Sequence, residues 1–203
     1  MQKLLSEWRQ CRIFLKKMSK YNLNQALKNI ILSQVIPWVF FGLCIAILPK
    51  GLWENDGFSF FGVNKITALP YVLAILVSSY FLLKAKKYFP GRIPFNTIAK
   101  LIPLMAVLMI AIAITPYTIN DAFGMIHQIF GILLFFIQFL LSIWLAFFVS
   151  KNRLNQIFFL VMLIGGLMSL FSILNKTSCL IEGQIIFQFA NGIILINTVA
   201  QDR

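Results

Sequence analysis

"FGMIHQIFGILLFFIQFLLSIWLAFFV", residues 123–149, decides the fold of this chain. The stretch contains no Asp, Glu, Lys or Arg, and its apolar residues run on without alternating with polar ones. A helix that crosses a membrane needs about 20 predominantly apolar residues, so this one is long enough to span with a tilt. The strands of a β-barrel would alternate apolar and polar residues in shorter segments. The stretch therefore predicts a transmembrane helix.

The composition of the whole chain agrees with this interpretation. Hydrophobic residues make up 60% of the 203 residues and charged residues 12%, against about 45–50% and about 25% in soluble domains. Five further apolar runs are long enough to span: residues 30–49, 67–83, 101–117, 155–174 and 180–199. We expect an all-α integral membrane protein with six transmembrane helices, its membrane domain covering residues 29–200.

The basic residues predict how the helices are oriented. Fifteen of the eighteen lysines and arginines fall before the first span, between the second and third, between the fourth and fifth, or after the sixth. Cytoplasmic loops of membrane proteins are enriched in Lys and Arg. Both termini, including the tail 201–203, are therefore expected in the cytoplasm, and we expect the protein to lie in a bacterial inner membrane. The net charge of +12 is explained by this asymmetry, so we expect no nucleic-acid partner.

Residues 1–28 form a separate, basic segment ahead of the first span. Five apolar residues recur at helical spacing and so share one face: Leu4, Trp8, Cys11, Leu15 and Met18. Such a helix lies in the membrane interface and is attracted to anionic lipid. The alternative is a positive-inside anchor that happens to be helical, and a docking arm for a membrane-protein partner is also open.

Two features predict how the helices bend and pack. Pro37 lies inside the first span and removes a helical hydrogen bond, and Ser33 and Gln34 are placed to satisfy the freed carbonyl. Gly165 and Ser169 share a face of the fifth span, as do Gly124 and Gly131 in the fourth, and small residues let helices approach closely in lipid.

The sixth span is the most polar. Gln184, Gln188 and Asn191 recur at i, i+4 and i+7, so they share a face. Amides facing lipid would lack partners, so this face is expected to point into the bundle, toward Gln128 or Gln138. It could line a substrate or headgroup cavity, or serve only in hydrogen bonds between helices.

His127, the only histidine, lies one turn inside the predicted outer edge of the fourth span. Glu182, Asp121 and Tyr117 fall at similar depth, and Glu182 and then Asp121 are its expected partners. Packing, contact with a lipid headgroup and acid–base chemistry remain open roles. Ser59 lies in no recognisable hydrolase motif. One histidine and three cysteines without CxxC spacing predict no metal and no cofactor.

The predicted first outer loop carries a resemblance. It holds "SFFG", residues 59–62, leading to "TALPY", residues 67–71, and a histidine opens the fourth span. In these stretches and in its six-span layout, the chain resembles bacterial membrane proteins of the type called domain of unknown function 998. Those in turn resemble the eukaryotic Frag/DRAM/Sfk group. The resemblance implies a six-helix membrane domain and no established activity, and the basic N-terminal segment is an addition to it.

The sequence favours a non-enzymatic membrane protein. It would bind a lipid or a membrane partner through an outer pocket formed by His127, Glu182, Asp121, Tyr117 and the amide face of the sixth span. A small transporter or immunity-type protein and a membrane-embedded lipid hydrolase are the alternatives. We also expect the first outer loop to fold back over the groups around His127.

Overall fold

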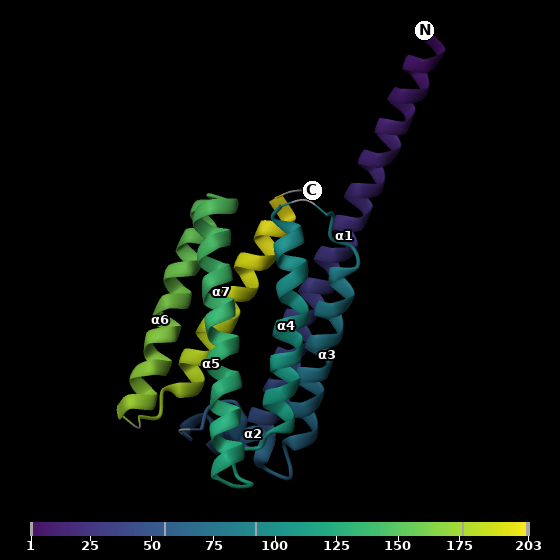
Figure 1. Cartoon of the computed structure of the whole chain (residues 1–203). Helices are drawn as coiled ribbons and strands as arrows, with labels where there is room; N and C mark the ends of the chain where they lie inside the picture. The colour runs from purple at the N-terminus through teal and green to yellow at the C-terminus, as the bar shows by residue number, and fades with distance from the viewer. Residues whose placement is uncertain (1, 55, 92, 176, 202–203) are drawn as a thin grey trace.

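The computed structural model describes the backbone of residues 2–54, 56–91, 93–175 and 177–201, with side chains from Tyr21 onward in those ranges. Six helices are long and apolar enough to cross a membrane, and no strand occurs in the described part of the chain (Figure 1). The predicted all-α, multi-pass membrane fold is confirmed. The long helices are α1 (Gln2–Ile47, apolar over Tyr21–Ile47), α3 (Ala68–Lys86), α4 (Phe95–Ile114), α5 (Asp121–Ile143), α6 (Arg153–Asn175) and α7 (Leu180–Gln201).

Three short elements complete the chain. The 3₁₀ helix η1 (Pro49–Trp53) and the one-turn helix α2 (Ser59–Val63) join α1 to α3. The π-helix η2 (Trp144–Val149) continues α5 to the end of its span. Because the long helices alternate in direction, α2 and the α4–α5 and α6–α7 turns lie at one end of the bundle, here called the α2 end. The C-terminus lies at the other, here called the C-terminal end (Figure 1).

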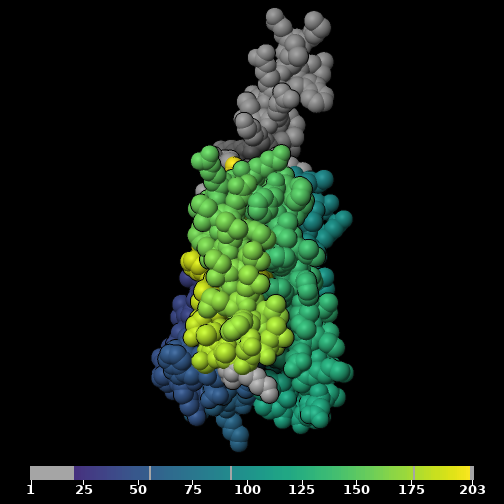
Figure 2. All heavy atoms as spheres, turned by 90° about the vertical axis from the view of Figure 1, so that its left-hand side faces the viewer, coloured from purple at the N-terminus to yellow at the C-terminus, as the bar shows by residue number. Residues whose placement is uncertain are grey.

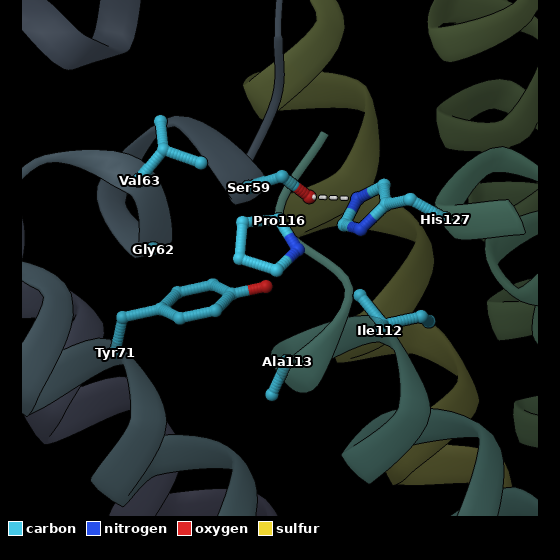
Figure 3. A pocket seen from close by; sticks show the side chains of 8 residues that line it. All are labelled: Ser59, Gly62, Val63, Tyr71, Ile112, Ala113, Pro116 and His127. Carbon is cyan, nitrogen blue, oxygen red and sulfur yellow. Dashed lines mark hydrogen bonds between the residues drawn. The ribbon is translucent and has the colours of Figure 1, made fainter. Parts of the chain in front are cut away.

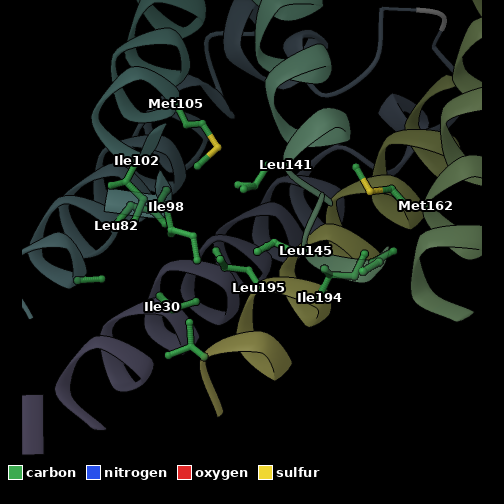
Figure 4. Packing of buried hydrophobic residues seen from close by; sticks show 14 of the residues in the cluster. Ile30, Leu82, Ile98, Ile102, Met105, Leu141, Leu145, Met162, Ile194 and Leu195 are labelled. Atoms are coloured by element: carbon green, nitrogen blue, oxygen red, sulfur yellow. The ribbon is translucent and has the colours of Figure 1, made fainter. Parts of the chain in front are cut away.

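Helices α1 and α5 join the α3–α4 side of the bundle to the α6–α7 side. Helix α3 packs between α1 and α4, while α7 packs between α1 and α6. Helix α5 packs on α4, and it contacts α7 directly and through η2. The main core lies between these helices and includes Ile30, Ile102, Leu141 and Ile194 (Figure 4). Helix α6 covers much of the face in Figure 2, and its outward residues, such as Leu167 and Phe171, are exposed and apolar, as lipid contact requires.

Most of the expected boundaries lie within three residues of the observed ones, and two differ by more. Helix α4 begins at Phe95, six residues before the expected Leu101, because the exposed Lys100 can extend toward the interface without ending the helix. Helix α1 is continuous from Gln2, with no break between the basic segment and the span. The predicted apolar stripe from Leu4 to Met18 lies outside the described side chains, so its interfacial position remains a prediction.

Helix α1 continues through Pro37, and the hydrogen bond lost there is replaced by a neighbouring helix. Proline has no N–H, so the carbonyl of Ser33, one turn earlier, loses its helical donor. The Ser78 hydroxyl of α3 donates to that carbonyl at 2.8 Å. The Ser33 hydroxyl itself donates to the Ile30 carbonyl at 2.7 Å. The expectation that Ser33 and Gln34 supply the donor was therefore wrong, because α3 offers a better-placed hydroxyl.

Helices α6 and α7 approach each other most closely at two glycines. A Cβ on Gly183 would lie 2.5 Å from the Ser169 hydroxyl and 2.7 Å from the Gly165 carbonyl, and one on Gly165 would lie 2.6 Å from the Phe187 nitrogen. The predicted packing role of Gly165 and Ser169 is confirmed. By contrast, a Cβ on Gly131 would meet nothing within 4 Å, so that glycine is not a packing residue.

Candidate functional site

The loop between α1 and α2 is fastened to α7. Gly57 adopts a positive φ of 64°, which is strained for other residues, and the Gln184 side chain lies where its Cβ would be. The next residue, Phe58, donates its backbone N–H to Gln184 Oε1 at 2.9 Å and stacks on Phe41 of α1 with ring centroids 4.5 Å apart. These contacts fix where the following helix, α2, begins.

Helix α2 is held by burial of its apolar side. Phe61 is fully buried, and its carbonyl accepts a hydrogen bond from the Thr67 hydroxyl at 2.8 Å. Gly62 makes room for the ring of Tyr71, which would lie 2.6 Å from a Cβ at that position. The stretches "SFFG" and "TALPY" therefore form one packed unit, and it presents Ser59 toward α5.

The turn between α4 and α5 supplies the other half of the site. Helix α4 ends at Ile114, before Pro116 and three residues short of the expected end at 117, so the Thr115 carbonyl has no helical donor. Helix α5 begins with Asn120 as its N-cap, whose Oδ1 accepts from the Phe123 N–H at 2.9 Å. This geometry places His127, in the second turn of α5, against the end of α4.

His127 joins these two parts through both ring nitrogens. Its Nδ1 lies 2.8 Å from the Thr115 carbonyl oxygen and its Nε2 lies 2.7 Å from Ser59 Oγ (Figure 3). A carbonyl can only accept, so Nδ1 carries the proton and the Nε2 of the neutral ring is the acceptor. The Ser59 hydroxyl therefore donates a hydrogen bond to His127 Nε2. The expectation that the first outer loop covers His127 is confirmed.

A small pocket opens beside this pair. Its volume is about 10 Å³, roughly the space for one water molecule. It is lined by Ser59, Gly62, Val63, Tyr71, Ile112, Ala113, Pro116 and His127. The Tyr71 hydroxyl points into the same space as the Ser59 hydroxyl (Figure 3). A hydroxyl donor and a Ser–His pair thus meet in a site that excludes all but the smallest groups.

Tyr117 lies at the edge of the site. Its ring centroid is 5.8 Å from that of His127, and its hydroxyl donates to Asp56 Oδ2 at 2.8 Å, which ties the α4–α5 turn to the α1–α2 loop. Burial and then the hydrogen bond to the Asp56 carboxylate raise the pKa of Tyr117 above its usual value. Tyr117 therefore stays protonated, and able to donate, throughout the physiological pH range.

The carboxylates expected beside His127 lie elsewhere. Both ring nitrogens of His127 already have other partners, so neither Glu182 nor Asp121 pairs with it. Asp121 is exposed in the first turn of α5. Glu182 is two residues from Gln184, about 200° around the helix, so it faces away from the loop that Gln184 holds. Its Oε2 is buried, with no hydrogen-bond partner among the described residues.

The amide face of α7 pairs with α5. Gln188 and Gln138 exchange two hydrogen bonds, of 3.1 and 2.9 Å, and the Ser142 hydroxyl donates to Asn191 Oδ1 at 3.0 Å. Deeper toward the C-terminal end, Asn155 of α6 accepts from Asn197 at 2.7 Å. We call these residues, with Thr198, the amide seam. The expected partner Gln138 is therefore found, whereas Gln128 is exposed on α5.

The seam and the pocket are separate. Gln188 and Asn191 do not line the pocket, and Gln184 acts on it only through the α1–α2 loop. No group of three His, Cys, Asp or Glu side chains that could hold a metal occurs in the described part of the chain. Sequence reasoning missed Ser59, whose partner is 68 positions away, and also Thr115 and Tyr71. The nearest signal for Ser59 was the glycine and aromatic pattern of its loop.

Comparison of the chain with known protein families, with characterised proteins and with solved structures finds no match. The site must therefore be interpreted from its own geometry, and the resemblance to proteins of the domain of unknown function 998 type remains a prediction.

Proposed function

We propose that this multi-pass membrane protein transfers or hydrolyses the acyl group of a lipid ester, with Ser59 as the nucleophile and His127 as the base. The observation that carries the proposal is the 2.7 Å hydrogen bond from Ser59 to His127, whose ring is oriented by the Thr115 carbonyl. A nucleophile bonded to a base that a third group orients is the geometric signature of covalent catalysis.

The pair can perform both halves of such a reaction. Ser59 Oγ attacks the ester carbonyl carbon and gives its proton to His127 Nε2. The C–O bond of the ester then breaks, and the leaving alcohol takes that proton, which leaves an acyl-serine. A water molecule, or another alcohol, attacks the acyl-serine in the same way and returns the proton to Ser59. The Tyr71 hydroxyl, which points into the same space, would donate to the negative oxygen that forms in each half.

The geometry supports this role better than binding alone. A pocket of about 10 Å³ accepts a carbonyl oxygen or a water but not a headgroup. The amides expected to line a larger cavity already have partners within the bundle: Gln188 bonds to Gln138, Asn191 to Ser142 and Gln184 to the Phe58 N–H. A lipid ester is the proposed substrate class because the site lies at one end of six apolar helices, where ester groups of a bilayer lie. From the distribution of basic residues, we propose that this end faces outward, with both termini in the cytoplasm of a bacterial cell.

A fluorophosphonate probe tests the proposal, since its phosphorus is attacked by an activated serine with loss of fluoride. In native membranes we expect the wild type to be labelled on Ser59, and Ser59→Ala and His127→Ala each to lose labelling by about 10⁴-fold or to below detection, because the pair acts as a unit. Ser142→Ala is the matched control, since that buried hydroxyl is bonded to an amide instead of an imidazole. It should label like the wild type.

Two further measurements complete the test. Released fatty acid from vesicles of acyl-labelled phospholipid should follow the same order of variants. A charged, membrane-impermeant form of the probe should label intact cells, if the α2 end faces outward. A folded wild type that takes no probe, or a Ser59→Ala variant that still does, would overturn the nucleophile assignment and leave His127 as a packing residue.

A further inference from the structure

A second, larger hollow lies between α4 and α5 at the C-terminal end of the bundle. It measures about 270 Å³ and is lined by Thr97, Leu101, Ile137, Leu140, Leu141 and Trp144. Thr97 is in the first turn of α4, whereas Thr115, at the Ser59–His127 site, follows its last turn. This hollow, here called the α4–α5 groove, is therefore a distinct feature almost a helix length from the candidate site.

The walls of the α4–α5 groove are almost entirely apolar. Thr97 is the one polar residue in its lining, and it lies at the end nearer the membrane surface. Leu141 is 4% exposed and belongs to the core that faces Ile98 and Met105 of α4, so it forms the floor (Figure 4). Leu140, 61% exposed, forms a rim. The groove is thus open to the surroundings of the bundle, which at this depth are hydrocarbon.

The surroundings of the groove indicate which lipid fits it. Lys100 is exposed on α4, three residues after Thr97 and next to Leu101. Lys151 lies between η2 and α6, and Arg153 begins α6, at the same end of the bundle. A long basic side chain here can reach the headgroup layer. The end of the groove near the surface therefore has one cation beside it on α4 and further cations in the segment that follows η2, while Trp144 is of the residue type enriched at this level.

We propose that the α4–α5 groove binds one acyl chain of an anionic phospholipid, with the lipid phosphate at Lys100. An apolar hollow of this size loses van der Waals contacts if it is left unfilled, and an acyl chain is the ligand that the bilayer supplies at that depth. The neighbouring bases select the negative headgroup over a zwitterionic one. The site is independent of the proposed acyl transfer, so either can fail without the other.

Trp144 reports on the occupant, because bromine atoms on a nearby acyl chain quench indole fluorescence. The variant Trp8→Phe, Trp38→Phe, Trp53→Phe keeps Trp144 as its only tryptophan. It is reconstituted in phosphatidylcholine containing a low fraction of dibrominated phosphatidylglycerol or, separately, of dibrominated phosphatidylcholine. We expect quenching by the phosphatidylglycerol to saturate at low fraction and to exceed that by the phosphatidylcholine severalfold.

Two changes should remove this preference. Lys100→Gln removes the charge that selects the headgroup, and Thr97→Phe fills the end of the groove. Leu104→Phe is the matched control, since Leu104 is 46% exposed on α4 and outside the groove lining. It should leave the preference unchanged.

Equal quenching by the two lipids in proportion to their fractions would overturn the proposal and reduce the groove to ordinary lipid contact. A preference that survives both Lys100→Gln and Thr97→Phe would also overturn it. So would loss of quenching when the protein self-associates, because a second copy would then cover the groove in place of lipid. If the triple tryptophan variant does not fold, native mass spectrometry of the wild type beside Lys100→Gln decides. Retention of one phosphatidylglycerol by the wild type alone supports the site, and equal retention overturns it.

Discussion

The Ser59–His127 site and the amide seam are both polar clusters inside an apolar bundle, but they are built differently. In the seam, amides pair with one another, as in the reciprocal bonds between Gln138 and Gln188, or with hydroxyls, as in the bond from Ser142 to Asn191. A side-chain amide is neither an acid nor a base at physiological pH, so no proton is transferred between the bonded partners. At the site, the Ser59 hydroxyl bonds to Nε2 of an imidazole whose Nδ1 is bonded to the Thr115 carbonyl. Nε2 is therefore the one ring nitrogen that can accept the hydroxyl proton. The seam satisfies polar groups that the bundle buries, whereas the site keeps an acid and a base in contact.

The two clusters also differ in what positions them. The seam lies between the long helices α5, α6 and α7, which contact one another, so its geometry follows from helix packing. The site depends on a loop, a one-turn helix and the ends of α4 and α5. A change in helix packing should therefore disturb both clusters, while a change within the seam should leave the site intact.

Gly183→Ala should have the largest effect. The new Cβ would lie 2.7 Å from the Gly165 carbonyl and from the Ser169 nitrogen, both backbone atoms, so α6 and α7 must separate. We expect a loss of about 1–3 kcal/mol, measured by thermal unfolding in detergent. Because Gln184 follows directly and holds Phe58, labelling of Ser59 should fall as well.

Gly131→Ala is the control for that experiment. A Cβ there meets nothing within 4 Å, so its stability should equal or slightly exceed that of the wild type. If Gly183→Ala unfolds at the wild-type temperature, the close approach of α6 and α7 is not needed for stability.

A double-mutant cycle on the seam should have a smaller effect. Gln138→Leu leaves the Gln188 amide unpaired and should cost about 1–2 kcal/mol, as should Gln188→Leu. The double variant should cost less than the two single losses combined, with a coupling of about 0.6 kcal/mol, because it removes both polar groups together. Labelling of Ser59 should not change in any of the three.

Gln128→Leu is the matched control for the cycle, since that amide is exposed on α5 and has no role in the seam. Additive losses in the cycle would show that the two glutamines do not act as a pair. Loss of probe labelling in the double variant would show that the seam and the site are coupled, which contradicts the separation argued above.

The sequence predicts the amide seam better than the Ser59–His127 site, because the seam depends on helices and the site on loops. The six helices and the pairing of the α7 amides with Gln138 follow from apolar length and helical period, which are local properties of the chain. The amide face had to point inward, and Gln138 on the predicted fourth span was one of two candidates for its partner. The exposed Gln128 shows the limit of this reasoning, since periodicity alone does not say which face of α5 meets α7.

The Ser59–His127 pair had no such local signal. It results from Gly57, Phe58 and Phe61 fastening a loop, and from the Thr115 carbonyl fixing the ring of a residue on another helix. Choosing Glu182 and Asp121 as partners used depth in the membrane and opposite charge. Depth in the membrane does not say on which side of its helix a residue lies. Glu182 lies on the side of α7 that faces away from the loop held by Gln184.

The smallest predicted effect concerns the hydrogen bond between Tyr117 and Asp56. This bond joins the α4–α5 turn to the α1–α2 loop beside the Ser59–His127 site, and it does not involve the seam. Tyr117→Phe removes one partly exposed hydrogen bond and should cost about 0.5 kcal/mol at pH 7, after allowance for solvent screening. The pKa of Tyr117 is raised on folding, so between its unfolded value, about 10, and the higher folded value the folded state binds more protons. Stability then falls as pH rises through that window. Thermal unfolding in detergent from pH 8 to pH 11 should therefore show a steeper loss above pH 10 in the wild type than in Tyr117→Phe, with the two curves parallel below it. Parallel curves throughout would mean that the hydroxyl is free in solution and that the α1–α2 loop is held over Ser59 by Gln184 and Phe58 alone.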